Sequence, residues 1–160
     1  AQQLERQRAN HTLSRVYLAL AEGHWTNQSK SGLIDRPIEK VPECFNRYQV
    51  ADTGRPSRTE YEVLSEFTYE ETPFSLVRLK LQTGRTHQIR VHMASLSHPL
   101  LGDSIYGHEG FLGFDRAALH SFEITCQLPG HQDLAVFSSE MPEDFQKMIA
   151  KSINFSSTLI

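Results

Sequence analysis

The sequence predicts an α+β fold with a mainly antiparallel β-sheet. Segments with strand patterns outnumber segments with helical patterns, and their spacing suits hairpins better than β-α-β units. The chain has 160 residues, of which 39% are hydrophobic and 9% aromatic, enough for the core of one domain. We therefore expect one domain over residues 1–150 and a tail over residues 151–160.

The predicted strands follow one another along the chain and are separated by turn signals. They cover residues 15–23, 58–67, 74–81, 119–128 and 133–138. Alternation of side chains in the first strand places Tyr17 on the opposite face from Val16 and Leu18. The turn at residues 68–73 is expected to pair the second and third strands antiparallel. Pro129-Gly130 marks the turn between the last two strands.

The pattern is weaker between the first two strands. Residues 24–40 form a predicted loop with a short extended piece at Leu33-Ile34, and residues 41–55 are predicted to be irregular. The candidates for phosphate contact in this region are Lys40, Arg47, Arg55 and Arg58. Acidic residues are mixed with them, so a solvated loop is the favoured interpretation.

Helices are predicted over residues 1–9, 86–96 and 142–151. In the second helix Thr86 is the candidate N-cap, and Pro99 lies just beyond the end because proline cannot continue a helix. The residues that share its expected core face are Ile89, Met93 and Leu96. Arg90 lies on another face with His87 and Ala94.

Positive charge is concentrated in residues 78–107. The cations there are Arg78, Lys80, Arg85 and Arg90, and the histidines are His87, His92 and His98. No acidic residue lies between Glu71 and Asp103, although the whole chain has 19 Asp and Glu against 16 Lys and Arg. A local excess of positive charge favours phosphate or a buried carboxylate as a partner. A solvated basic face on an amphipathic helix explains the same pattern.

Two other classes of site compete for this stretch. A metal site would need the three histidines to converge, but spacings of five and six residues place them on different faces, unlike the H-E-x-x-H pattern. No metal is therefore expected. A generic phosphate-binding domain also accounts for the basic residues.

Composition bears on the location of the protein. The sequence has no apolar run of about 18 residues and no pattern of a secretory leader, so we expect a cytoplasmic protein without a membrane partner. Cys44 and Cys126 are far apart and form no C-x-x-C pair, which is typical of reduced thiols.

Residues 83–107, TGRTHQIRVHMASLSHPLLGDSIYG, resemble the most recognisable motif of the RluA family of RNA pseudouridine synthases. The match keeps the order G-R-T-H-Q-I-R-V-H, H-P, G-D and Y-G. Shorter segments resemble further family motifs: RVYLA at 15–19, GLIDRPI at 32–38, PSRTEYEV at 56–63, LHS at 119–121 and PEDF at 142–145. The resemblance therefore extends over roughly residues 1–150.

The resemblance implies a mixed sheet with flanking helices around an RNA cleft. It implies an enzyme that isomerises uridine to pseudouridine in ribosomal or transfer RNA, without a cofactor or metal. Arg90 is then expected to pair with the nucleophilic aspartate, and Tyr17 to stack on the uracil and assist removal of the C5 proton. The residues expected to contact RNA or to position the binding loop are Lys80, Arg85, His87 and Gln88. The full-length protein is expected to be a monomer.

The sequence departs from the family at the nucleophile, an aspartate in an H-R-L-D-x-x-T-S-G motif that is absent from these residues. Asp103 matches the G-D that the family uses structurally. We therefore expect the nucleophile upstream of Ala1, a chain that is inactive alone, and an Arg90 without its partner. A chain that lacks part of its sheet is also expected to be poorly stable or to self-associate. The alternative is a non-catalytic RNA-binding module that uses the same basic cleft.

Overall fold

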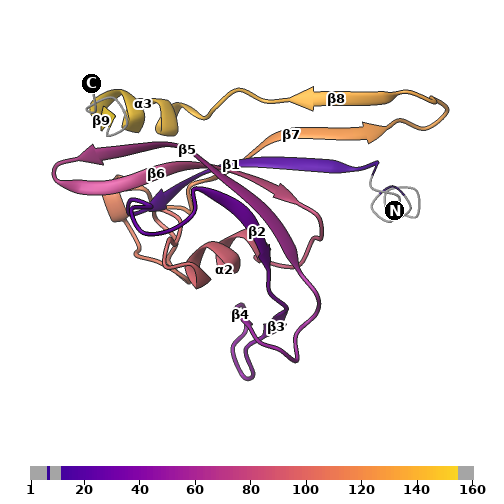
Figure 1. Ribbon diagram of the computed structural model, residues 1–160, viewed down its shortest axis with the longest axis horizontal. Coiled ribbons are helices and arrows are strands. Elements are labelled where there is room, and N and C mark those ends of the chain that lie inside the picture. The colour runs from indigo at the N-terminus through magenta and orange to yellow at the C-terminus, as the bar shows by residue number, and fades with distance from the viewer. Residues whose placement is uncertain (1–6, 8–11, 155–160) are drawn as a thin grey trace.

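The structure, a computed structural model, describes residue 7 and residues 12–154 (Figure 1). The predicted helix over residues 1–9 lies outside the described residues apart from Gln7. The Gln7 side chain is buried and holds the backbone of Gln127: its Nε2 donates to the Gln127 carbonyl at 2.7 Å, and its Oε1 accepts the Gln127 N–H at 2.8 Å.

The described residues form one seven-stranded sheet. Its strands are β1 (Ser14–Glu22), β2 (Ser31–Asp35), β5 (Arg58–Tyr69), β6 (Thr72–Leu81), β7 (Leu119–Gln127), β8 (Leu134–Ser138) and β9 (Ile153–Asn154). Their order is β2-β5-β6-β1-β7-β8, and β9 pairs with β5. Every pairing described in this sheet is antiparallel, which confirms the predicted fold class and the mainly antiparallel sheet.

A second, small sheet consists of β3 (Ile38–Lys40) and β4 (Tyr48–Val50), which pair antiparallel. Figure 1 shows this β3–β4 hairpin extending away from the main sheet, on the side where α2 (Gln88–Ser95) lies. The sequence predicted irregular chain at residues 41–55, so the hairpin is a correction. Its two strands are only three residues long, too short to show an alternation pattern.

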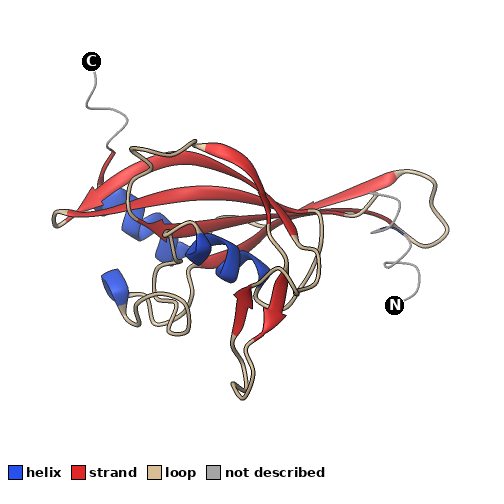
Figure 2. Cartoon of the chain, turned by 60° about the horizontal axis from the view of Figure 1, so that its bottom comes forward, coloured by secondary structure: helices blue, strands red, loops and turns tan. Residues whose placement is uncertain are grey.

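The sheet has an apolar cluster on each face because β1 is buried on both sides. Leu18 and Leu20 face a cluster that includes Phe145 and Met148 of α3 (Glu143–Lys151). The alternate β1 residues face a second cluster that includes α2; its members are Ala19, Ala21, Trp25, Val77, Leu79, Ile89, Met93 and Leu100. The two helices therefore cover opposite faces of the sheet, α3 above it and α2 below it in Figure 1. Figure 2 shows the long curved strands of the sheet in red and the helices in blue.

The long β5–β6 hairpin closes with a two-residue turn. Tyr69 is opposite Thr72, and Glu70 and Glu71 between them have φ values of 46° and 64°. Two consecutive left-handed residues are the geometry of a type I′ turn, whose twist matches that of the strands. The predicted antiparallel hairpin is confirmed.

Helix α2 ends where the sequence predicts. Ser97 has φ 65°, its N–H donates to the Ala94 carbonyl at 3.0 Å, and the His98 N–H donates to the Met93 carbonyl at 3.0 Å. These two bonds form a Schellman motif, which satisfies the last carbonyls of the helix before Pro99.

Part of the expected tail belongs to the folded chain. Lys151 ends α3, Ile153 and Asn154 form β9, and residues 155–160 lie outside the described part. Cys44 and Cys126 are both free cysteines. No helix in the described residues is both long enough and apolar enough to cross a membrane.

Candidate functional site

Arg90 projects from α2 onto a fully buried carboxylate, that of Asp103. Its Nε donates to Oδ2 and its Nη2 to Oδ1, both at 2.7 Å. The Asp103 side chain is 0% exposed and that of Arg90 is 18% exposed. Without the nucleophilic aspartate, Arg90 was expected to be left unpaired, but in the structure it pairs with Asp103 instead. The resemblance implies a structural role for Asp103, and in the structure its carboxylate binds the Arg90 guanidinium through two hydrogen bonds. We call this contact the Asp103 clamp.

Local backbone geometry holds Asp103 in place. A side chain on Gly102, which has φ 68°, would lie 2.5 Å from the carbonyl oxygens of Phe114 and Arg116, so only glycine fits there. After it, Asp103 Oδ1 also accepts the N–H groups of Ile105 at 3.0 Å and Tyr106 at 3.1 Å. The carboxylate is buried but fully hydrogen-bonded.

These contacts decide the ionisation of the pair. Burial acts to raise the pKa of Asp103, but the hydrogen bond from Arg90 and the amides of Tyr106 and Ile105 outweigh it, so the pKa lies below its usual value. The hydrogen bond to Asp103 raises the pKa of Arg90. Both groups are charged at neutral pH, and the guanidinium is fixed in orientation.

Tyr106 connects this ion pair to the β3–β4 hairpin. The Arg90 guanidinium lies over the Tyr106 ring, with Cζ 5.0 Å from the ring centroid. The Tyr106 hydroxyl accepts the backbone N–H of Tyr48 at 3.0 Å and lies 2.9 Å from Nδ1 of His87. The His87 ring makes edge contacts with both tyrosine rings, with centroids 5.6 Å apart.

His87 was expected either to contact phosphate or to position a loop, and its surroundings favour positioning. Burial and the nearby Arg90 charge lower the pKa of His87, so the imidazole is neutral at pH 7 and carries no charge for phosphate. His87, with φ 56°, is also the N-cap of α2. The prediction of Thr86 at this position is wrong, because the turn continues one residue further before helical geometry begins.

Gln88 was expected to contact RNA, but it is only 2% exposed. Its Oε1 accepts the Thr83 hydroxyl at 2.8 Å and the Arg85 N–H at 3.0 Å. Its Nε2 donates to the Arg58 carbonyl and to the Thr59 hydroxyl, both at 2.9 Å. The whole carboxamide is used inside the protein, so Gln88 supports the turn that carries Arg85.

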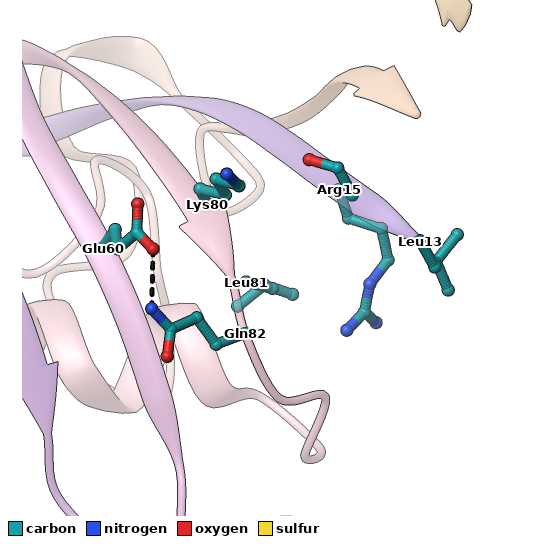
Figure 3. A pocket seen from close by; sticks show the side chains of 7 residues that line it. Leu13, Arg15, Glu60, Lys80, Leu81 and Gln82 are labelled. Carbon is teal, nitrogen blue, oxygen red and sulfur yellow. Dashed lines mark hydrogen bonds between the residues drawn. The ribbon is translucent and has the colours of Figure 1, made fainter. Parts of the chain in front are cut away.

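Lys80 lies on the face of the sheet opposite to α2 and Arg90. Its neighbours Leu79 and Leu81 pack in the cluster that contains α2, so alternation along β6 directs Lys80 to the opposite face. Lys80 lines a pocket of about 210 Å³ together with Arg15 and Glu60. Figure 3 shows these three side chains. The structure does not bring Lys80 together with Arg90.

Tyr17 and Arg85 are on the Arg90 side. Tyr17 is half-buried and packs against the cluster that contains Ile89, on the face opposite to Leu18, as predicted. Arg85 is exposed in the turn before α2, and its Nε donates to the Pro56 carbonyl at 3.4 Å. The site therefore combines a fixed guanidinium, a tyrosine on the same sheet face and a cation on the adjoining turn.

The three histidines have separate partners. His92 is fully buried, 2.9 Å from the Thr59 hydroxyl and 2.9 Å from the Arg36 carbonyl, and His98 Nδ1 lies 2.7 Å from the Glu22 carbonyl. No group of three metal-ligating side chains is found in the part of the chain that the structure describes.

The open side of Arg90 defines what the site can do chemically. Nε and Nη2 are committed to Asp103, whereas Nη1 makes no hydrogen bond with the described residues. A guanidinium can fork onto one carboxylate and still donate to another. The sequence contained a signal for the Asp103 contact, since Asp103 is the first acidic residue after the basic stretch.

Comparison with known proteins identifies the class. The profile of the family described as RNA pseudouridylate synthase matches residues 1–95, more than half of this chain, and the chain belongs to that family. Its long motif and its curated relatives are those of the RluA type.

Three relatives illustrate the similarity. The chain is 36% identical to the ribosomal large subunit pseudouridine synthase D of Nitrosomonas europaea, a match over 91% of this chain and 43% of the relative. It is 39% identical to the uncharacterized RNA pseudouridine synthase YhcT of Bacillus subtilis, over 91% of this chain and 46% of the relative. The ribosomal large subunit pseudouridine synthase D of Escherichia coli is 35% identical, over 84% of this chain and 47% of the relative. The chain spans less than half the length of these relatives.

The fold agrees with solved structures. Human RNA pseudouridylate synthase domain containing 1 superposes with a TM-score of 0.75 at 28% identity, over 96% of this chain and 64% of that one. Human RNA pseudouridylate synthase domain containing 4 has a TM-score of 0.67 at 18% identity, over 94% and 66%, which supports the fold alone.

Proposed function

We propose that this chain is the arginine-bearing part of an enzyme that isomerises uridine to pseudouridine in ribosomal or transfer RNA. The observation that carries the proposal is the Arg90 guanidinium, which is fixed by buried Asp103 and open at Nη1. The nucleophilic aspartate would come from a segment outside these residues, because the sequence has no H-R-L-D motif. Alone, the chain would not catalyse the reaction.

Each residue then has a defined task. The reaction breaks the bond between N1 and the ribose, rotates the base and forms the new bond at C5. A proton leaves C5 and N1 takes up a proton, so atoms balance without a cofactor. An ionised carboxylate in a partly dry cleft needs a cation beside it, or its pKa rises and it takes up a proton. Arg90 would supply this cation through Nη1, and Tyr17 would stack on the uracil and assist removal of the C5 proton. Arg85 would contact RNA phosphate.

Lys80 and Gln88 have no part in this proposal. Lys80 faces the other side of the sheet, and the Gln88 amide is consumed by internal hydrogen bonds.

A second candidate is an RNA-binding module without catalysis, and the absence of the nucleophile motif favours it. An extension of the chain to include an upstream H-R-L-D motif separates the two. Tritium release from RNA labelled at C5 of uridine is expected from the extended protein and not from the 160-residue chain. Arg90→Ala in the extended form is expected to abolish release. If the extended protein binds RNA but releases no tritium, the binding module is favoured.

A further inference from the structure

We propose that a cavity at the base of the β3–β4 hairpin is a binding subsite for an RNA phosphodiester. The cavity has a volume of about 440 Å³ and is lined by residues from the hairpin, the following loop and the turn before α2. Three cations lie around it: Lys40, Arg55 and Arg85. The inference takes its ligand class from the proposed function, and it assigns the RNA contact to a place separate from Arg90.

The charges of these three cations are not neutralised by the protein. Most other cations of the described residues have carboxylate partners; these are Lys30, Arg58, Arg78, Arg90, Arg116 and Lys147. In contrast, Lys40 and Arg55 make no side-chain hydrogen bond or ion pair with the described residues, and Arg85 uses only Nε, on a carbonyl. Cations left unpaired around one hollow attract a phosphate rather than stabilise the fold.

One acidic residue, Glu39, also lines the cavity. Its carboxylate accepts the Thr53 hydroxyl at 2.7 Å and the Gln49 amide at 3.1 Å, and these hydrogen bonds lower its pKa. The Glu39 carboxylate is thus hydrogen-bonded to Thr53 and Gln49 and forms no ion pair with the three cations. Three cations against one carboxylate leave the cavity positive.

The backbone fixes the chain positions of two of these cations, Lys40 and Arg55. Ile38 and Arg55 exchange two backbone hydrogen bonds, 3.0 Å from the Ile38 N–H and 2.8 Å from the Arg55 N–H. A Cβ on Gly54 would lie 2.6–2.8 Å from backbone atoms of Ile38, so glycine at this position allows the loop to lie against β3. As a result, Arg55 lies opposite Ile38, two residues from Lys40, and these backbone positions are set before any ligand binds.

The subsite adjoins Arg90 through the hairpin contacts already described. Tyr48 lines the cavity, and its N–H is bound by the hydroxyl of Tyr106, over whose ring Arg90 lies. A strand of RNA with its phosphate in this cavity would pass beside the open edge of Arg90. We therefore assign to the subsite a phosphate that flanks the target nucleotide.

Salt-dependent binding tests the assignment without turnover. The 160-residue chain is titrated against a fluorescein-labelled RNA stem-loop with uridines in its loop, from 50 to 300 mM salt. Removal of one cation that binds a phosphate of a single strand lowers the slope of log K against log salt by about 0.7, which is roughly a fourfold weaker affinity at 0.15 M. Lys40→Ala, Arg55→Ala and Arg85→Ala are each expected to show this change, and the triple variant about three times the change in slope.

The controls separate a local contact from overall charge and from misfolding. Lys147→Ala removes an exposed cation on α3 and is expected to leave the slope unchanged, whereas Arg85→Lys keeps the charge and should keep most of the slope. The three side chains are exposed, so the variants should melt like the parent. No salt-dependent binding by the parent, or equal slopes in the parent and the triple variant, would overturn the subsite. Failure of tritium release alone would count only against the proposed catalysis.

Discussion

Arg90 and Asp103 form a two-pronged ion pair, with the Nε–Oδ2 and Nη2–Oδ1 distances both 2.7 Å. The pair lies within one chain, and it joins α2 to the loop that follows the helix. Asp103 accepts four hydrogen bonds, two from Arg90 and two from backbone amides. The carboxylate is therefore a structural element of the site as well as a partner of the arginine.

Replacement of Asp103 by alanine should destabilise the fold. Removal of one partner of a buried ion pair costs about 3–5 kcal/mol, and we expect the lower end because Arg90 keeps 18% exposure to water. Urea denaturation measures the decrease in the free energy of unfolding. Asp133→Ala, in the exposed β7–β8 turn, is the matched control. An equal effect of both variants would refute the clamp.

Tyr106→Phe should loosen the β3–β4 hairpin but leave Arg90 in place. The variant keeps the ring under Arg90 and removes the hydroxyl that accepts the Tyr48 N–H. Loss of one hydrogen bond corresponds to about 1 kcal/mol, roughly a fivefold faster opening. Amide hydrogen exchange at Tyr48 is expected to accelerate accordingly. Tyr69→Phe on β5 is the control, and unchanged exchange in Tyr106→Phe would contradict the link.

His92 should make stability fall at mildly acidic pH. Its Nε2 faces the Arg36 carbonyl and must donate, so Nδ1 accepts the Thr59 hydroxyl and the ring is neutral. Burial lowers the pKa of His92, so below about pH 6.5 the unfolded chain binds a proton that the folded chain does not. The free energy of unfolding therefore decreases as pH falls below 6.5, with a slope of up to about 1.4 kcal/mol per pH unit.

The matched variants for this pH dependence are His92→Gln and His131→Asn. His92→Gln should be less stable at pH 7.5 yet lose less stability between pH 7 and pH 5. His131 is exposed, and its replacement should not change the slope. His87, whose pKa is also lowered, keeps part of the slope in both variants. Parallel curves for His92→Gln and the parent would remove His92 from the explanation.

Tyr17→Phe in the extended, active form should separate binding from chemistry. If Tyr17 assists removal of the C5 proton, tritium release should slow by about 100-fold or more, the usual contribution of general acid–base catalysis. RNA affinity should be unchanged because the ring remains. Wild-type kinetics in this variant would make Tyr17 a packing residue of the sheet face.

The edge strand β8 should drive self-association of the 160-residue chain. It ends the sheet order and exposes Leu134 at 53%, Val136 at 61% and Phe137 at 52%. An exposed apolar edge strand is a template for pairing with another chain. Light scattering after gel filtration should show dimers or larger species, and Val136→Lys should reduce them. A monomeric parent at high concentration would show that the edge is tolerated.

The sheet could be predicted because burial on one face leaves a period of two in the sequence. Leu79 and Leu81 alternate with Arg78 and Lys80, and the structure buries Leu79, half-buries Leu81 and exposes the two cations. The end of α2 was predictable as well, because Pro99 limits a helix from outside. The β3–β4 hairpin was not, since its pairing depends on tertiary contacts such as that between Tyr48 and Tyr106.

The candidate site was predicted in its residues more than in its contacts. Arg90 lies where the helical pattern places it, but its pairing with Asp103 depends on the loop geometry set by Gly102, which periodicity does not encode. Gln88 belongs to the same motif as Arg90, yet it points inward. A motif defines which residues occur together and does not distinguish those that contact a ligand from those that support them.

The Tyr106 hydroxyl and ring serve two parts of the molecule at once, the hairpin and Arg90. If the state of the hairpin changes how tightly Arg90 holds a ligand, thermodynamic linkage requires that ligand to stabilise the same state of the hairpin by an equal free energy. Under the proposed subsite, binding of RNA at the hairpin and occupation of the open edge of Arg90 would be coupled in both directions, with Tyr106 as the connecting residue. The Asp103 ion pair keeps the guanidinium oriented in either case, so this coupling would act through the Tyr106 ring beside Arg90 and not through a loss of order in the arginine.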